Sequence, residues 1–284
     1  MDTISVIGAG TMGAGIAQAV ALAGFQVILY DVADDLLEES LARIQVSLDK
    51  GVARGKTDTA VAESAKSAFT LTTSLAEAAQ ADLIMEAAPE KMALKREIFA
   101  ELDAAAPQHT IFTSNTSSLS IAALAVSTRR ADKFLGLHFF NPAHIMKLVE
   151  VITGDDTSEE TLNICLAFVK RLGKTAVLCK DTPAFIVNRV ARPYYGEAFR
   201  SLGENMADAP TIDKLMKSIG FRMGPFELID LIGADVNLAV TQSVYDAYYQ
   251  EPKYRPHPIQ RHMVEGGRLG RKTGRGFYDY NMEG

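Results

Sequence analysis

His138 and Glu150 are the residues of this chain best suited to move a proton. His138 lies near the end of an apolar segment, residues 134–139, and Glu150 lies inside a second one, residues 148–152. If the two segments are neighbouring strands, the carboxylate can face the imidazole, fix its tautomer and stabilise its charged form. Such a pair can take the proton of an alcohol while hydride leaves the same carbon. The alternative is a structural pair, in which the glutamate needs a partner simply because it is buried.

A glycine-rich hexad near the start of the chain has the pattern that holds a dinucleotide. Residues 8–13 read Gly-x-Gly-x-x-Gly, follow an apolar run and open a helical stretch, and Asp31 ends the next apolar run. The glycines permit a tight turn, close approach of a pyrophosphate and close packing of helix on strand. The N-terminus of the helix offers N–H groups and partial positive charge to phosphates. The predicted cofactor contacts here are Gly8, Gly10, Thr11, Met12, Gly13 and Asp31.

The position of Asp31 favours NAD among the dinucleotides. A carboxylate there can accept hydrogen bonds from the adenosine ribose and would repel the 2′-phosphate of NADP. The same hexad also fits FAD. A chain of this size with a separate helical part suits a nicotinamide dehydrogenase better, which is an argument by analogy. A glycine-rich turn without a ligand is the remaining alternative.

Three further polar groups could contribute to a site. Residues 114–118, Ser-Asn-Thr-Ser-Ser, follow an apolar run and could hold a nicotinamide or a substrate oxygen, or serve as a turn and a helix cap starting at Ser118 or Ser120. Asn188 and Arg189 lie early in a later helical stretch, residues 185–202, and could reach a cleft or cap an interface. A basic cluster could bind a phosphorylated substrate or form a solvated face, and it comprises Lys50, Arg54 and Lys56.

The elements that must position these residues alternate between strands and helices. The strand-like segments are residues 4–7, 25–30, 69–71, 83–87, 111–113, 134–139, 148–152 and 176–178, and the helical ones include 11–23, 36–52, 91–105 and 159–172. Alternation of this kind predicts an α/β fold with a Rossmann-type, doubly wound and mostly parallel sheet. The connection between residues 139 and 148 is too short for a crossover helix, so those two strands are expected to be antiparallel.

The second part of the chain reads as a small all-helical domain. Helices are expected over residues 185–202, 211–219, 226–249 and 258–265. Pro183 disfavours helix at the residue before it and marks the boundary. We therefore expect a dinucleotide-binding domain over residues 1–182 and a helical domain over residues 183–284.

Composition narrows the class of protein. The 284 residues are 48% hydrophobic and 23% charged, the net charge is −6, and there are two cysteines. These values are typical of a globular protein and argue against broad nucleic-acid binding and against a membrane span. Neither cysteine has metal-ligand spacing, so no metal is expected. The N-terminus lacks a signal-peptide pattern and the cysteines are expected to be free thiols, and both features favour the cytoplasm.

Taken together, these motifs resemble the short-chain 3-hydroxyacyl-CoA dehydrogenases, and most of all the bacterial 3-hydroxybutyryl-CoA dehydrogenases. The resemblance extends over residues 4–280 and is carried by residues 6–13, 114–118, 138–142, 181–189 and 270–278. It implies NAD-dependent oxidation of (S)-3-hydroxyacyl-CoA to 3-oxoacyl-CoA. It also implies a homodimer formed through the helical domain and a cleft between the domains.

The resemblance assigns roles to individual residues. His138 matches the general base, Glu150 its orienting carboxylate, and Ser117 and Asn188 the groups that bind the reacting oxygen. The matching cofactor contacts are Asp31, Glu90, Lys95, Asn115, Ser117, Asn141 and Lys272. The basic cluster occupies the region that binds coenzyme A phosphates.

One departure and three alternatives remain. The family usually has glycine where Ala184 stands, a change we expect helical geometry to tolerate. Relatives with the same fold act on 3-hydroxyadipyl-CoA or on sugar acids such as gulonate, and the basic cluster favours a coenzyme A substrate. A non-catalytic NAD-binding protein of the crystallin type would not need the His138–Glu150 pair.

Overall fold

The computed structural model describes residues 1–281, which fall into two compact units. The first unit ends at Thr182 and the second begins at Pro183. No helix in the described part of the chain is long and apolar enough to cross a membrane.

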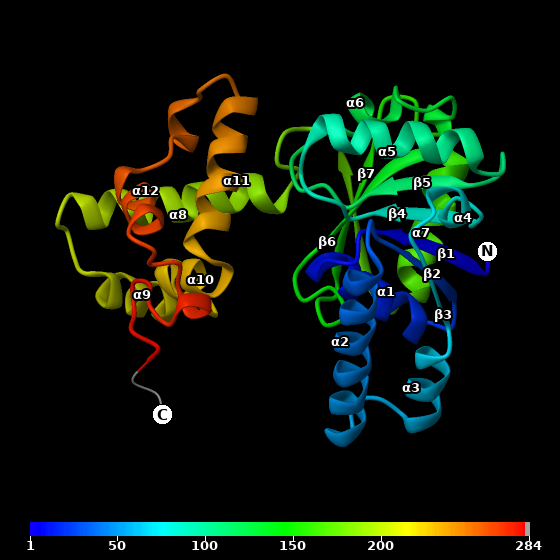
Figure 1. Ribbon diagram of the computed structural model, residues 1–284. Helices are drawn as coiled ribbons and strands as arrows, with labels where there is room; N and C mark the ends of the chain where they lie inside the picture. Colours follow the sequence, from blue (N-terminus) through cyan, green and yellow to red (C-terminus); the bar gives the residue numbers. More distant parts are fainter. Residues whose placement is uncertain (282–284) are drawn as a thin grey trace. The chain divides into compact units, whose positions relative to one another are not determined.

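The first unit is built on one eight-stranded sheet (Figure 1). The strand order is β3-β2-β1-β4-β5-β6-β7-β8, and every neighbouring pair is parallel except β6 and β7. The order 3-2-1-4-5-6 is that of a dinucleotide-binding fold, so the predicted α/β class is confirmed. The strands are β1 (Thr3–Ile7), β2 (Gln26–Tyr30), β3 (Phe69–Thr72), β4 (Leu83–Glu86), β5 (Ile111–Ser114), β6 (Phe134–Phe139), β7 (Leu148–Thr153) and β8 (Thr175–Lys180).

Helices cover both faces of this sheet. Figure 1 shows α5 and α6 on one side and α1 with α2 on the other. Nine of the twelve residues of α1 are buried, which explains its nearly uniform apolar sequence. The helices are α1 (Thr11–Leu22), α2 (Asp34–Ala53), α3 (Thr59–Lys66), α4 (Leu75–Ala78), α5 (Met92–Ala105), α6 (Ile121–Ala125), the 3₁₀ turn η1 (Ala131–Lys133) and α7 (Glu159–Arg171).

The second unit is helical, as predicted. Its core contains Phe199, Phe226 and Ile229, each buried. The buried carboxylate of Asp230 accepts the backbone N–H groups of Phe277 and Tyr278, both at 3.0 Å, and so attaches the last segment to this core. The elements are α8 (Val187–Gly203), α9 (Ala209–Ser218), α10 (Pro225–Ile232), α11 (Ala234–Ala247), η2 (Pro252–Tyr254), α12 (Pro258–Glu265) and η3 (Arg271–Thr273).

Two predictions about this unit are wrong. The single helix expected over residues 226–249 is two helices, because Gly233 has a φ of +103° and an α-helix cannot continue through that conformation. Ala184 does not have helical geometry either. It lies in the left-handed region, with a φ of 67°, and Phe185 follows at 50°, so α8 begins only at Val187. A glycine would have no Cβ to strain there, which is a physical reason for the family's usual residue.

Candidate active site

The predicted proton-transfer pair is formed in the first unit. Strands β6 and β7 are antiparallel, as expected, and His138 is directly opposite Glu150 in their register. Nδ1 of His138 lies 2.7 Å from Oε2 of Glu150, and the side chains are only 8% and 1% exposed. At this distance, out of water, the carboxylate fixes the orientation and the tautomer of the imidazole. The ring of Phe140, whose centroid is 4.5 Å from that of His138, packs against the imidazole.

The glycine hexad forms the turn from β1 into α1, and its geometry leaves room for a ligand. A Cβ on Gly8, where φ is +102°, would lie 2.9 Å from the Ala87 carbonyl oxygen, and one on Gly13 would lie 1.7 Å from the Gly8 carbonyl oxygen. A Cβ on Gly10 would meet no atom within 4 Å. Gly8 and Gly13 are therefore required by the fold itself, whereas Gly10 leaves an open space beside the start of α1. Gly10 is also the N-cap of α1 and offers no side chain to its first N–H groups, which suits a phosphate.

Asp31 follows β2 and lies against the same loop. Its Oδ2 accepts the N–H of Ala9 at 2.6 Å, and its Oδ1 accepts the N–H of Val32 at 2.7 Å. These two bonds hold the carboxylate beside the hexad, where a bound adenosine ribose would be expected.

A buried ionic network that the sequence analysis missed connects the ends of β4 and β5. Oε1 of Glu86 accepts the Ala88 N–H and the Lys95 ammonium, both at 2.6 Å, and Oε2 accepts the Ser114 hydroxyl at 2.5 Å. Burial raises the pKa of Glu86, and the Lys95 charge offsets this effect only in part. Glu86 is fully buried and holds Lys95 in place. The sequence does contain a signal for this network. Glu86 is an acidic residue at the end of an otherwise apolar strand, and a carboxylate buried there needs a partner.

Three of the predicted cofactor residues converge on this network. Nζ of Lys95 lies 3.3 Å from Oε2 of Glu90. Oε1 of Glu90 accepts the Thr116 hydroxyl at 2.6 Å and the Ser117 N–H at 2.8 Å. Burial raises the pKa of Glu90, but the Lys95 charge and these hydrogen bonds outweigh it, so the pKa is lowered overall and the carboxylate stays charged at neutral pH. The Glu90 carboxylate thus organises the loop after β5 that carries Ser117.

Asn115 links this loop to the histidine strand. Its Oδ1 accepts the N–H of Phe139 at 2.8 Å, immediately after His138. The loop then continues to Ser120, whose hydroxyl accepts the N–H of Ala123 at 3.1 Å and caps α6. The sequence left open whether Ser118 or Ser120 caps this helix, and in the structure the cap is Ser120.

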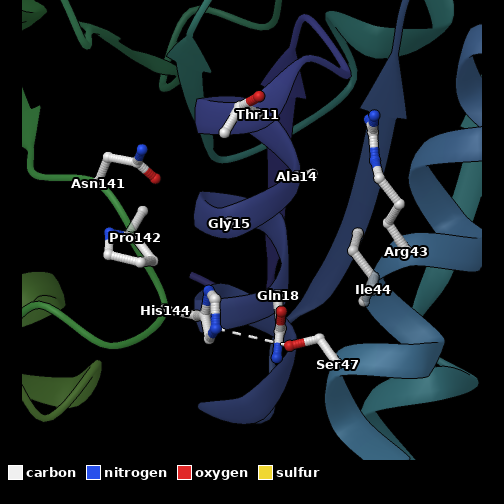
Figure 2. A pocket seen from close by; sticks show the side chains of 11 residues that line it. Thr11, Ala14, Gly15, Gln18, Arg43, Ile44, Ser47, Asn141, Pro142 and His144 are labelled. Atoms are coloured by element: carbon white, nitrogen blue, oxygen red, sulfur yellow. Dashed lines mark hydrogen bonds between the residues drawn. The ribbon is translucent and has the colours of Figure 1, made fainter. Parts of the chain in front are cut away.

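A cavity of about 210 Å³ lies between α1, α2 and the loop after β6. Figure 2 shows Asn141 and His144 on that loop facing Arg43 and Ser47 of α2, with Thr11 near the start of α1. His144 Nε2 lies 3.5 Å from the Ser47 hydroxyl, and the Arg43 Nη2 donates to the Ala9 carbonyl at 3.1 Å. Two predicted cofactor residues, Thr11 and Asn141, line this cavity, together with four polar residues that the sequence analysis did not name, Gln18, Arg43, Ser47 and His144.

The basic cluster is exposed near the end of α2. Lys50 lies in the last turn of α2, Arg54 is its C-cap, and Lys56 follows in the loop toward α3. Cations at a helix C-terminus are favoured by its partial negative charge, so the structure is compatible with either alternative, a solvated face or a phosphate site.

The remaining predicted residues belong to the second unit. Asn188 is the second residue of α8 and is half-buried. Nζ of Lys272 lies 2.6 Å from a carboxylate oxygen of Asp235, a partner that the sequence did not reveal. In the described part of the chain, no three side chains of His, Cys, Asp or Glu are grouped to hold a metal ion.

A doubly wound sheet, a glycine turn open to a phosphate and a buried His–Glu pair define a dinucleotide-dependent oxidoreductase. The chain belongs to the 3-hydroxyacyl-CoA dehydrogenase family. Residues 3–182 match the family's NAD binding domain, and residues 185–280 match its C-terminal domain. The predicted family and the predicted cofactor, NAD, are therefore confirmed.

Several relatives are similar over the whole chain. A 3-hydroxyadipyl-CoA dehydrogenase of Escherichia coli is 45% identical over all of this chain, which spans only 60% of that protein's length. A probable 3-hydroxybutyryl-CoA dehydrogenase of Bacillus subtilis is 44% identical over 98% of this chain and 96% of its own. The crystal structure of an (S)-3-hydroxybutyryl-CoA dehydrogenase from Ralstonia eutropha superposes with a TM-score of 0.93, is 42% identical and is matched over 99% of both chains.

Proposed function

We propose that this chain oxidises the 3-hydroxyl group of an (S)-3-hydroxyacyl-CoA to a ketone with NAD, and catalyses the reverse reduction. The buried His138–Glu150 pair, with its 2.7 Å contact, is the observation that carries the proposal. It combines a base with a fixed tautomer and a buried carboxylate that compensates the positive charge the base acquires.

His138 takes the proton of the substrate hydroxyl as general base. Because Nδ1 is held by Glu150, Nε2 is the atom that receives the proton. Ser117 and Asn188 donate hydrogen bonds to the reacting oxygen and stabilise its developing negative charge. The nicotinamide of bound NAD would supply the acceptor for the hydride that leaves the substrate carbon. In the reverse direction the imidazolium returns its proton to the ketone oxygen.

The cofactor is held by residues of the glycine turn, by Asp31 and by the groups around Glu86. The turn offers the N–H groups of α1 to the pyrophosphate, and Asp31 accepts the ribose hydroxyls. The Glu86–Lys95–Glu90 chain fixes the loop that carries Ser117. The proposed contacts are Gly8, Gly10, Thr11, Met12, Gly13, Asp31, Glu90, Lys95, Asn115, Ser117, Asn141 and Lys272.

The coenzyme A phosphates bind the basic cluster of Lys50, Arg54 and Lys56. Two observations support this: the three side chains are exposed near the end of α2, and the groove along α2 continues from Arg43 through Ser47 to Lys50. The cluster favours a coenzyme A thioester over a free sugar acid. The two relatives described above are dehydrogenases of 3-hydroxyadipyl-CoA and of 3-hydroxybutyryl-CoA, so the acyl group is either adipyl or butyryl.

We further infer that the protein is a cytoplasmic homodimer associated through its second unit. That unit exposes several large apolar side chains, among them Val190, Leu215, Ile219 and Phe221, which are 47–69% exposed. Leu215 and Ile219 are four residues apart at the end of α9 and so lie on one side of it, and an exposed apolar patch of this kind is typical of an association surface. Light scattering should give twice the monomer mass, and a monomer at micromolar concentration would contradict the inference.

Acetoacetyl-CoA and NADH provide the direct test of the activity. The purified chain should consume NADH absorbance in proportion to thioester, with far less turnover of free acetoacetate or with NADPH. Lys50→Glu combined with Lys56→Glu should raise KM for the thioester at least tenfold, and the exposed Lys170→Glu on α7 is the matched control. Absence of turnover with every acyl-CoA would refute the proposed function, whereas an unchanged KM would refute only the phosphate site.

A further inference from the structure

Four polar side chains lie buried together inside the second unit. Arg192 of α8 donates from Nη1 to the Asn237 carbonyl oxygen and to the Thr241 hydroxyl of α11, each at 3.1 Å. Gln260 of α12 donates from Nε2 to Asn237 Oδ1 at 2.6 Å and to Thr241 Oγ1 at 3.0 Å. The four residues are only 1–7% exposed, so little water reaches this polar cluster.

The cluster has more donors than acceptors. Nε of Arg192 and Nδ2 of Asn237 are buried and have no hydrogen-bond partner among residues 1–281. Among the described residues, the guanidinium of Arg192 donates to the neutral oxygens of Asn237 and Thr241 and lies 4.8 Å from the centroid of the Tyr195 ring. Burial lowers the pKa of Arg192 to about 10, which leaves it charged at neutral pH. A buried cation without a counterion, beside a second unused N–H donor, is the environment that an anionic oxygen ligand satisfies.

The position of Arg192 on α8 indicates which anion this is. Asn188 and Arg192 are four residues apart, so they lie on the same face of the helix, about 6 Å apart along its axis. Asn188 is the proposed donor to the oxygen on C3 of the substrate. In a six-carbon dicarboxylic acyl group the terminal carboxylate is three carbon–carbon bonds beyond C3, a span comparable with the rise of about 6 Å that separates Asn188 from Arg192 on α8. A butyryl group ends one bond beyond C3 and offers no charge.

We propose that Arg192 binds the terminal carboxylate of a dicarboxylic 3-hydroxyacyl-CoA and thereby selects that class of substrate over neutral acyl-CoAs. Asn237 supplies a second donor, and Thr241 and Gln260 hold Asn237 and the guanidinium in position. The inference rests on the proposed dehydrogenase activity and adds the substrate class to it. The alternative, in which Arg192 only joins α8 to α11, gives no dependence on the end of the acyl chain.

Three substrates test this with the unmodified protein. We would measure kcat/KM for 3-hydroxyadipyl-CoA, for 3-hydroxyhexanoyl-CoA, which has the same chain length without the carboxylate, and for 3-hydroxybutyryl-CoA. The adipyl substrate should exceed the hexanoyl one by about tenfold to a hundredfold, the usual range for a charge-assisted hydrogen bond. Equal values for the adipyl and hexanoyl substrates would overturn the inference while leaving the dehydrogenase activity intact. No turnover of any of the three would refute the activity itself.

Substitution of Arg192 tests whether this residue causes the preference for the adipyl substrate. Arg192→Met should lower the ratio of the adipyl to the hexanoyl kcat/KM at least tenfold, mainly through the adipyl KM. Arg200→Met is the matched control, because Arg200 lies two turns later on α8, pairs with Glu197 at 3.1 Å and is 43% exposed. It should leave the ratio unchanged. If Arg192→Met lowers both substrates equally, Arg192 is structural. If that variant does not fold, the ratio measured with the unmodified protein still decides the question.

Discussion

Substituting Gly10 by alanine should separate the stability of the fold from binding of the cofactor. A Cβ at Gly10 meets no protein atom within 4 Å, and the backbone φ of −66° is one that alanine adopts without strain. Alanine restricts the unfolded chain, which stabilises by about 0.4–1 kcal/mol. It is a poorer N-cap than glycine, by an amount of about 0.5–1 kcal/mol. These contributions oppose each other, so the free energy of unfolding should change by less than about 1 kcal/mol.

The affinity for NADH should fall at the same time. The space that the new methyl group occupies is where the pyrophosphate approaches the N-terminus of α1, so we expect the Kd for NADH to rise at least tenfold. Gly13→Ala is the contrasting variant, because its Cβ would lie 1.7 Å from the Gly8 carbonyl oxygen. That overlap forces α1 away from β1 and should destabilise the protein by about 1–3 kcal/mol.

Urea unfolding of the ligand-free proteins and fluorescence titration with NADH measure the two quantities independently. The reasoning predicts that Gly10→Ala unfolds at the wild-type urea concentration and binds NADH weakly, whereas Gly13→Ala is impaired in both. Wild-type NADH affinity in Gly10→Ala would refute the assignment of this turn to the pyrophosphate. Wild-type stability in Gly13→Ala would refute the packing argument.

Three other predictions follow from the contacts described above. Glu150→Gln keeps the shape of the pair but removes its charge, so kcat should fall by about 10²–10⁴ with the Kd for NADH unchanged, as stopped-flow and titration would show. Asp103 of α5 accepts hydrogen bonds from the side chains of Arg129 and Arg130. Burial raises the pKa of Asp103, but these hydrogen bonds outweigh that effect and hold the pKa below its usual value. The stabilisation is therefore present above the unfolded pKa and is lost as pH falls through the folded one, so the difference in unfolding free energy between wild type and Asp103→Asn should shrink as the pH falls from about 5 through the unfolded pKa of about 3.9. Burial raises the pKa of the Cys165 thiol to about 12, so this cysteine should resist a thiol reagent at neutral pH until the protein is unfolded, and rapid labelling of the native protein would contradict its burial.

Most strands and helices of the first unit could be predicted, because each is indicated by a short stretch of its own sequence. Each of the eight strands is a short apolar run, and the glycine hexad and Asp31 fall at fixed places relative to β1 and β2. Helix α3 was missed because its buried positions are only the alanines Ala62 and Ala65, which give a weak periodic pattern. The short helix α4 has four residues, too few for periodicity to detect.

What could not be predicted depends on backbone conformation and on long-range pairing. The break at Gly233 and the positive φ of Ala184 are conformations that an apolar helical pattern conceals. Glu86 and Lys95 meet nine residues apart, across a loop, and Arg192 meets Asn237 from a different helix. Lys95 and Arg192 look like ordinary surface charges in the sequence, and only their burial shows that each must have a partner.

Turnover by His138→Asn tests the central claim most directly. The exposed His109, whose Nε2 lies 3.2 Å from a carboxylate oxygen of Asp82, offers a matched histidine–carboxylate pair away from the proposed site. With acetoacetyl-CoA and NADH, His138→Asn should lose at least about a thousandfold in kcat while binding NADH normally. His109→Asn should keep the wild-type rate. A His138→Asn protein that reduces acetoacetyl-CoA within tenfold of the wild-type rate would contradict the assignment of His138 as the base.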